Sequence, residues 1–209
     1  MSMQPSGAPE KKALRQQLMA LRNGVAPEQR AAWSQAIYQH VIALPAYQSA
    51  RVVHCFVTIR TEVDTRPIIE HALSHDKRIA IPLFVRRSDE TPACEITSLA
   101  DEDYETDPFG LRVPRHMRLV DLDSIDLVLV PLLAFAPTLT PTLPLARGRE
   151  ERGWLRLGYG AGFYDRFLSR VRAPKVGIAF QMQRVAQLPR EPHDILLDAV
   201  ITEAGDQPA

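Results

Sequence analysis

The sequence predicts an α/β protein, a layered α/β/α sandwich with a mainly parallel sheet. Short apolar runs of strand type alternate with helical patterns along the chain. The run 126–135 is apolar almost throughout, as expected for a parallel strand that is buried on both faces. A glycine-rich turn then precedes another helical pattern, an arrangement that suits phosphate binding.

Length and charge restrict the class of protein further. A chain of 209 residues suits one domain, 1–209, with a substantial core. Lys plus Arg and Asp plus Glu both number 25, and this balance argues against a nucleic-acid partner. The longest apolar run is too short to span a bilayer, and the first ten residues lack an apolar signal core. We therefore expect a cytoplasmic protein with no membrane contact.

The first half of the chain predicts helices from leucine spacing and from prolines at helix starts. Leu14, Leu18 and Leu21 define the first helix, and Pro27 suits the first turn of the second. Thr65 is expected to cap a third helix that contains Pro67. In order, the expected elements are helix 11–22, helix 27–44, strand 52–59, helix 67–73 and strand 78–82.

The second half predicts more strands than helices. The expected elements are strand 94–98, a loop at 104–115, strand 126–135, helix 163–171, strand 176–180, a loop or short helix at 181–188 and strand 199–201. Segments 1–9 and 205–209 are expected to be disordered tails. Cys55 and Cys94 provide neither a disulfide framework nor the spacing of metal ligands, so small core residues are expected there.

The glycine turn carries the first chemical signal. Glycines stand at 158, 160 and 162, and a glycine within a regular element destabilises the fold by roughly 0.5–1 kcal/mol relative to alanine. A chain tolerates this where the backbone bends through positive φ or where a ligand approaches closely. Asp165 adds a hard oxygen of the kind that Mg2+ takes. The spacing fits neither the dinucleotide fingerprint nor the P-loop, and a tight turn without a ligand is the alternative.

Two other places could serve a ligand. Lys11 and Arg15 are four residues apart and share one helix face, either toward a ligand or toward solvent. Glu62 and Asp64 follow a strand, where open α/β sheets bind ligands. The alternative is that Asp64 or Thr65 caps the next helix and Glu62 is solvated.

Longer motifs give these places a context. The string from Arg156 to Asp165 reads RLGYGAGFYD and matches R-L-G-x-G-x-G-Y/F-Y-D, the signature of the 5-formyltetrahydrofolate cyclo-ligase family. Lys11 and Arg15 match that family's K-x-x-x-R, and the stretch starting at Glu62 matches its E-[IV]-[DE]-T. Phe109 begins a match to F-G-[IL]-x-x-P. The sequence thus resembles this family over nearly its whole length.

The resemblance implies a fold similar to the sugar-isomerase and CoA-transferase superfamily. It also implies an ATP-dependent closure of 5-formyltetrahydrofolate to 5,10-methenyltetrahydrofolate, with ATP as co-substrate and Mg2+ as cofactor. Lys11 and Arg156 would be catalytic, and Asp165 and Asp194 would hold the metal. The implied ATP-binding residues are Lys11, Lys12, Ala13, Leu14, Arg15, Arg156, Leu157, Gly158, Tyr159, Gly160, Ala161, Gly162, Phe163 and Tyr164. The implied folate-binding residues are Val57, Glu62, Tyr159, Gly160, Ala161, Gly162 and Phe163.

The sequence departs from the family pattern at 137–153. This stretch is rich in proline and then in charge, and we expect an inserted surface loop there. Two other functions stay open: a non-catalytic folate-binding or regulatory protein, and a sugar-phosphate or CoA-ester enzyme on the same fold. We expect small-molecule partners only and a monomer. His193 taken alone indicates a surface histidine.

Overall fold

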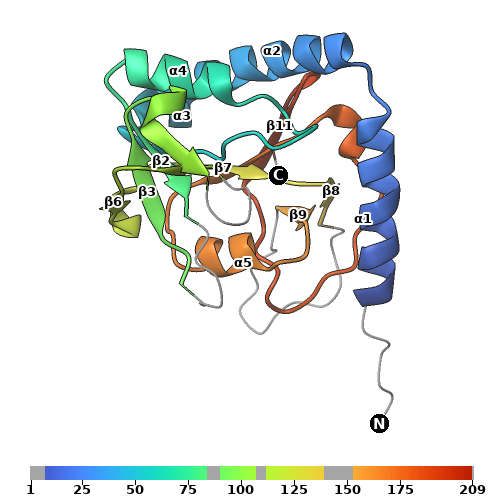
Figure 1. Cartoon of the computed structure of the whole chain (residues 1–209). Coiled ribbons are helices and arrows are strands. Elements are labelled where there is room, and N and C mark those ends of the chain that lie inside the picture. The colour runs from blue at the N-terminus through green and yellow to red at the C-terminus, as the bar shows by residue number, and fades with distance from the viewer. Residues whose placement is uncertain (1–7, 84–89, 107–111, 139–152, 209) are drawn as a thin grey trace.

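The computed structural model describes residues 8–83, 90–106, 112–138 and 153–208. An eight-stranded sheet with the order β12-β11-β10-β7-β1-β2-β3-β6 forms the centre (Figure 1). Its five inner strands are parallel, and the edge pairings β11–β12, β2–β3 and β3–β6 are antiparallel. The strands of this sheet are β1 (Val52–His54), β2 (Arg78–Pro82), β3 (Ala93–Ile96), β6 (Arg118–Val120), β7 (Leu127–Pro131), β10 (Lys175–Ile178), β11 (Ala199–Thr202) and β12 (Gly205–Pro208). The predicted fold class is confirmed.

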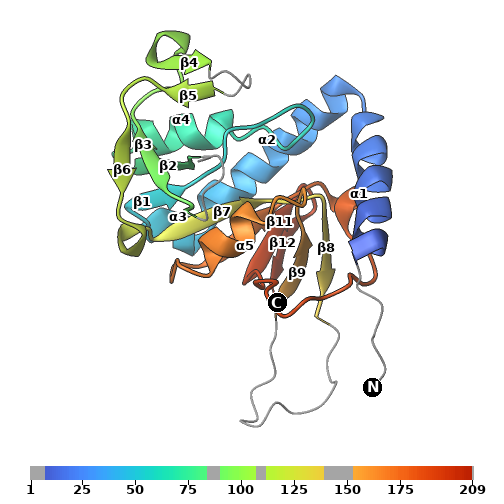
Figure 2. The same ribbon diagram turned by 60° about the horizontal axis from the view of Figure 1, so that its bottom comes forward.

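Helices lie on both faces of the sheet. One face carries α2 (Pro27–Ala43), α3 (Pro45–Ser49) and α4 (Arg66–Ser74), and the other carries α5 (Phe163–Leu168) (Figures 1 and 2). A buried apolar cluster fills each interface, with Ile37 and Ile68 in the first and Phe167 in the second. Both cysteines are buried and free, as expected.

The first helix, α1 (Ala8–Asn23), stands beside the sheet rather than on either face (Figure 1). Leu18 is buried against a two-stranded sheet made of β8 (Ala134–Pro137) and β9 (Trp154–Leu157). The helix starts at Ala8, so the tail expected at 1–9 is too long by two residues, and residues 1–7 lie outside the described ranges. No helix among the described residues is long and apolar enough to cross a bilayer.

Two expected strands differ most from their predicted bounds. The strand expected at 52–59 ends at His54, because the following residues turn away to form a loop at the cavity, where Thr65 Oγ1 donates to the Phe56 carbonyl (2.7 Å). The strand expected at 126–135 breaks after Pro131 into β7 and β8. Pro131 has no N–H with which to continue the hydrogen bonds of the sheet, and the Leu132 carbonyl accepts a hydrogen bond from the Gln183 side-chain amide (2.8 Å).

Three further expectations are wrong. The expected loop at 104–115 contains two paired strands, β4 (Tyr104–Thr106) and β5 (Arg112–Pro114), while the motif residues 109–111 lie outside the described part. Most of the expected tail at 205–209 forms β12, which pairs with β11 and provides hydrogen-bond partners for the backbone at the outer edge of that strand. The helix expected at 163–171 ends at Leu168. Two short 3-10 turns, η1 (Asp101–Asp103) and η2 (Leu122–Ser124), were not predicted, whereas η3 (Gln181–Gln183) lies in the expected loop or short helix.

The expected insertion at 137–153 is the connection of a hairpin. Pro137 pairs with Trp154, and the Thr138 N–H donates to the Gly153 carbonyl (3.0 Å). The ends of the segment therefore belong to the folded body, and residues 139–152 lie outside the described ranges.

Candidate active site

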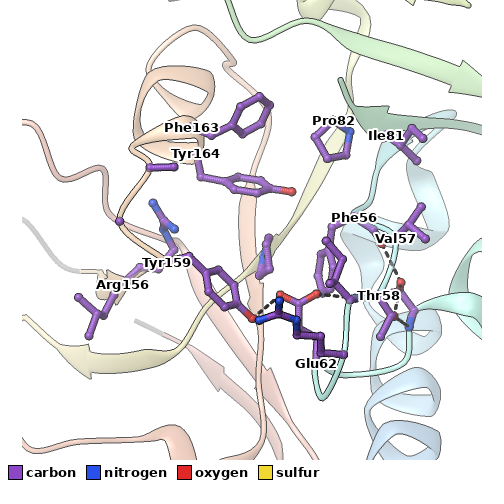
Figure 3. A pocket seen from close by; sticks show the side chains of 18 of the residues that line it. Phe56, Val57, Thr58, Glu62, Ile81, Pro82, Arg156, Tyr159, Phe163 and Tyr164 are labelled. Carbon is purple, nitrogen blue, oxygen red and sulfur yellow. Dashed lines mark hydrogen bonds between the residues drawn. The ribbon is translucent and has the colours of Figure 1, made fainter. Parts of the chain in front are cut away.

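A cavity of about 900 Å³ opens at the carboxyl ends of β1, β2 and β7. This is the edge at which open α/β sheets bind ligands. Its walls come from α1, the loop after β1, the end of β2, the glycine turn and residues 191–194. Figure 3 shows the side chains of Phe56, Val57, Ile81, Pro82 and Phe163 around this space, which gives one side of it an apolar surface.

The glycine turn forms one wall. Gly160 has φ 101° and Gly162 has φ 65°, conformations that residues with a side chain rarely adopt. A side chain at 160 would also crowd the Arg15 guanidinium, whose carbon lies 3.2 Å from the Cβ position. The turn therefore requires glycine at both positions, and the backbone comes close to a cation from α1.

Two basic residues of α1, Lys11 and Arg15, line the cavity. Arg15 Nε donates to the Gly158 carbonyl (2.9 Å). Lys11 is 6% exposed, and its Nζ lies 2.8 Å from Glu191 Oε2 and 2.9 Å from Asp194 Oδ2. Burial alone would lower the pKa of Lys11, but the hydrogen bonds to these two carboxylates raise it above its ordinary value. The alternative of a solvated basic face is excluded for Lys11.

Three neighbours on α1 are placed elsewhere. Lys12 and Ala13 are exposed, and Leu14 packs in the apolar cluster under the helix. The structure does not bring these three side chains to the cavity. Leu157 and the residues from Gly158 to Tyr164 do line it, as do Val57 and Glu62.

Glu62 lies on the loop after β1 and faces Tyr159. The Tyr159 hydroxyl donates to Glu62 Oε1 (2.5 Å), and the Ile59 N–H donates to Oε2 (2.9 Å) (Figure 3). Burial raises the pKa of Glu62, while these two hydrogen bonds and the Arg22 charge partly oppose the shift. The carboxylate is thus an acceptor held at the cavity rather than a solvated side chain. Asp64 keeps the other role, accepting from the Arg66 N–H at the start of α4 (3.0 Å).

Arg156 and Asp165 form an ion pair. Arg156 is 9% exposed and projects from β9, and its Nη2 lies 2.6 Å from Asp165 Oδ1. Its guanidinium carbon also lies 5.7 Å from the centre of the Tyr164 ring. One oxygen of the expected metal ligand therefore already has a partner, and Arg156 is fixed beside the glycine turn by that contact.

The second expected metal ligand belongs to a larger group. Asp194 lies with Glu191 and His193, and one ligand atom from each falls within 4.8 Å of the others. The two carboxylates are the hard oxygen donors that suit Mg2+, although Lys11 binds the same oxygens. His193 is 69% exposed in its side chain, as its surface assignment predicts. Asp165 and Asp194 have different ion-pair partners, Arg156 for Asp165 and Lys11 for Asp194.

The hydroxyl of Tyr164 is buried without a hydrogen-bond partner among the described residues. The ring packs edge-on against His54 and Phe167, and the hydroxyl points toward the part of the cavity lined by Phe56 and Pro82 (Figure 3). Burial raises the pKa of Tyr164, so this hydroxyl stays protonated and can donate. A buried donor without a partner at a cavity wall fits a ligand acceptor.

Two cavity residues, Glu191 and Arg22, were not predicted from the sequence. Arg22 is 4% exposed and lines the cavity from the last turn of α1. The helical spacing that joined Lys11 to Arg15 also reaches position 22, so extending that face would have found it. Glu191 had no such signal, because its partner Lys11 is 180 residues away in sequence.

The fold and the site define an α/β enzyme in which buried cations and a glycine turn share one cavity with a carboxylate. Comparison with known proteins identifies the group within that class. The chain belongs to the 5-formyltetrahydrofolate cyclo-ligase family, whose model matches residues 8–140 and 143–203. The two-residue break between these ranges falls within the expected insertion.

Individual relatives agree with this membership. The chain is 28% identical over 211 residues to the 5-formyltetrahydrofolate cyclo-ligase of Mus musculus, covering 95% of each chain. It is 29% identical over 192 residues to that of Escherichia coli K12, covering 87% of this chain and 93% of the relative. The solved 5,10-methenyltetrahydrofolate synthetase of Aquifex aeolicus is 28% identical with a TM-score of 0.75, covering 95% of this chain and 92% of that one.

Proposed function

We propose that this protein converts 5-formyltetrahydrofolate and ATP to 5,10-methenyltetrahydrofolate, ADP and phosphate. The observation that carries the proposal is a single cavity lined by two chemically different groups of side chains. One group is the cations Lys11, Arg15 and Arg156, and the other is the Glu62 carboxylate with the apolar side chains. Cations and backbone N–H groups suit phosphate, and a carboxylate beside an apolar surface suits the N–H donors of a flat pterin.

The proposed reaction needs positioning and charge more than a protein nucleophile. The formyl oxygen attacks the γ-phosphorus of ATP, and ADP leaves. N10 of the folate then attacks the activated carbon, the N10 proton is lost, and the carbon–oxygen bond breaks to release phosphate. Phosphoryl transfer depends mainly on alignment and on neutralising the oxygens, which is the role we assign to Lys11, Arg15 and Arg156.

The substrate side needs fewer charged groups. Glu62 would accept hydrogen bonds from the pterin, while Val57 and Phe163 would contact its faces. The Tyr164 hydroxyl would donate to an acceptor of either ligand. Tyr159 and Phe163 both reach the cavity, and either ring could stack on the pterin or on the adenine.

We also propose that Asp165 and Asp194 bind Mg2+, and that Glu191 joins Asp194. The close grouping of Glu191 and Asp194 supports a hard cation at that end of the cavity. When bound, Mg2+ would neutralise phosphate oxygens. The protein's own contribution is to hold those carboxylates, Asp194 by the Glu191 N–H (2.7 Å) and Asp165 by Arg156. We further propose that the protein is cytoplasmic and that it is a monomer, since one chain supplies the cations, the carboxylate and the apolar side chains of the cavity.

The test is the absorbance of methenyltetrahydrofolate, followed with and without ATP. We expect product only with ATP, and equal amounts of ADP. Folate binding without turnover would instead indicate the regulatory alternative. Turnover of a sugar phosphate or a CoA ester, with none of the folate, would indicate another enzyme on this fold. A titration of activity with Mg2+ and chelator tests the metal proposal.

A further inference from the structure

Arg22 is a buried arginine at the end of α1, and the proposed reaction gives it no role so far. Its side chain makes two hydrogen bonds, from Nε to Thr61 Oγ1 (3.2 Å) and from Nη2 to the Tyr159 hydroxyl (2.7 Å). Its guanidinium carbon lies 5.7 Å from the centre of the Tyr159 ring. Arg22 thus joins α1 to two segments of the cavity wall.

The contact with Tyr159 continues to Glu62. The same hydroxyl that accepts from Arg22 donates to Glu62 Oε1 (2.5 Å). A hydroxyl placed between a cation and a carboxylate is polarised in one direction, and each bond strengthens the other. Arg22, Tyr159 and Glu62 therefore form a series of charge-assisted hydrogen bonds along the wall of the cavity.

We propose that Arg22 is a positioning residue for the folate, which acts through Tyr159 to keep the Glu62 carboxylate ionised and aimed into the cavity. The inference rests on the proposed function and adds a residue to its substrate side. A carboxylate accepts hydrogen bonds from two folate donors, whereas a protonated carboxyl has lost one acceptor. Arg22 would therefore affect folate affinity without contacting the folate.

The groups around Glu62 agree with this role. Arg22 faces it from α1, Tyr159 from the glycine turn and Tyr164 from α5, and Arg22 is the one cation among the electrostatic partners of Glu62 in the described residues. The neighbours in its own loop, Arg60 and Asp64, are exposed. Since burial already raises the pKa of Glu62, loss of the Arg22 charge would raise it further.

The alternative is that Arg22 only anchors α1 through Thr61. The experiment compares Arg22→Gln with the unmodified chain, measuring kcat and KM for both substrates across pH. We expect the KM for folate to rise roughly ten-fold, the lower end for loss of a charged hydrogen bond, and the KM for ATP to stay unchanged. The acid limb of kcat/KM for folate should move to higher pH, because Glu62 then protonates more easily. Arg22→Lys should restore part of both effects.

Two further variants separate the routes. Thr61→Val removes the other hydrogen bond of Arg22 and should alter thermal stability without shifting the acid limb. Tyr159→Phe removes the hydroxyl that links Arg22 to Glu62. Because the Tyr159 residue is 46% exposed, this variant should fold, and its acid limb of kcat/KM for folate should move in the same direction. In the Tyr159→Phe background, Arg22→Gln should add little to the folate KM, because both changes remove one pathway.

Equal rises of both KM values, or a lower melting temperature with an unmoved acid limb, would overturn this role for Arg22. Should Arg22→Gln fail to fold, an unmoved acid limb in Tyr159→Phe would overturn it as well. Absence of ATP-dependent turnover in the unmodified protein would contradict the proposed function instead, so the two failures are distinguishable.

Discussion

Replacing Lys11 by methionine tests the phosphate side of the cavity. Methionine keeps most of the side-chain volume and removes the ammonium group. The Lys11 side chain is 7% exposed, and its Nζ bonds two carboxylates at 2.8 and 2.9 Å. Loss of the ammonium group removes the ion-pair partner that Glu191 and Asp194 share.

The magnitude follows from partial burial. Breaking a fully buried ion pair costs about 3–5 kcal/mol, but the Glu191 side chain is 32% exposed and water will screen it. We expect a loss of about 1–3 kcal/mol, which corresponds to roughly 2–12 °C in melting temperature for a chain of this size. If Lys11 also contacts the phosphates, the KM for ATP should rise at least about ten-fold, since a charged hydrogen bond contributes about 1.5–3 kcal/mol.

The assay is steady-state kinetics in each substrate, together with thermal unfolding. Lys12→Met is the matched comparison, because Lys12 is exposed on the next position of the helix. A smaller effect at Lys12 is expected. A larger effect at Lys12 would refute the placement of the helix face, and an unchanged KM for ATP in Lys11→Met would show that Lys11 is structural.

Three other changes test separate parts of the molecule. Glu62→Gln should raise the KM for folate roughly ten-fold and leave the KM for ATP unchanged. In the unmodified protein, the KM for folate should rise as the pH falls through the raised pKa of Glu62. This pH dependence should disappear in Glu62→Gln. Tyr164→Phe removes a buried hydroxyl that has no hydrogen-bond partner among the described residues. The free energy of unfolding should stay equal or rise by up to about 1 kcal/mol, while kcat/KM should fall. A large loss of stability would contradict the geometry. Replacing 139–152 by a short turn should leave the melting temperature within a few degrees of the unmodified value. The flanking strands β8 and β9 are paired with each other, and a change of loop length costs little, about 0.6 kcal/mol per doubling. Trypsin should cleave the native chain first between 147 and 152, and protection of that segment would contradict this expectation.

The sequence predicted the parts of the site that depend on neighbouring residues. The glycine turn, the basic face of α1 and the carboxylate after β1 each follow from spacing within a few residues. The bounds of β2 agree with the expected 78–82, where a short run of apolar residues ends at a proline. Local patterns of this kind are largely independent of the rest of the fold.

Contacts between distant segments were not predicted. The ammonium of Lys11 meets Asp194, which is 183 residues away, and no local pattern connects them. The break after Pro131 depends on Gln183, and the hairpin of β8 and β9 closes across the inserted segment. The edge strand β12 has few apolar residues and forms because β11 offers it an unpaired edge.

The central claim is that ATP and the folate meet in one cavity and that the γ-phosphoryl group is transferred to the formyl oxygen. The direct measurement uses 5-formyltetrahydrofolate carrying 18O in the formyl group and follows the label by mass spectrometry after one turnover. The account predicts that the label appears in the released phosphate, one labelled oxygen for each methenyltetrahydrofolate formed. Label in water with unlabelled phosphate would contradict transfer to the formyl oxygen and the role assigned to the cations around the glycine turn.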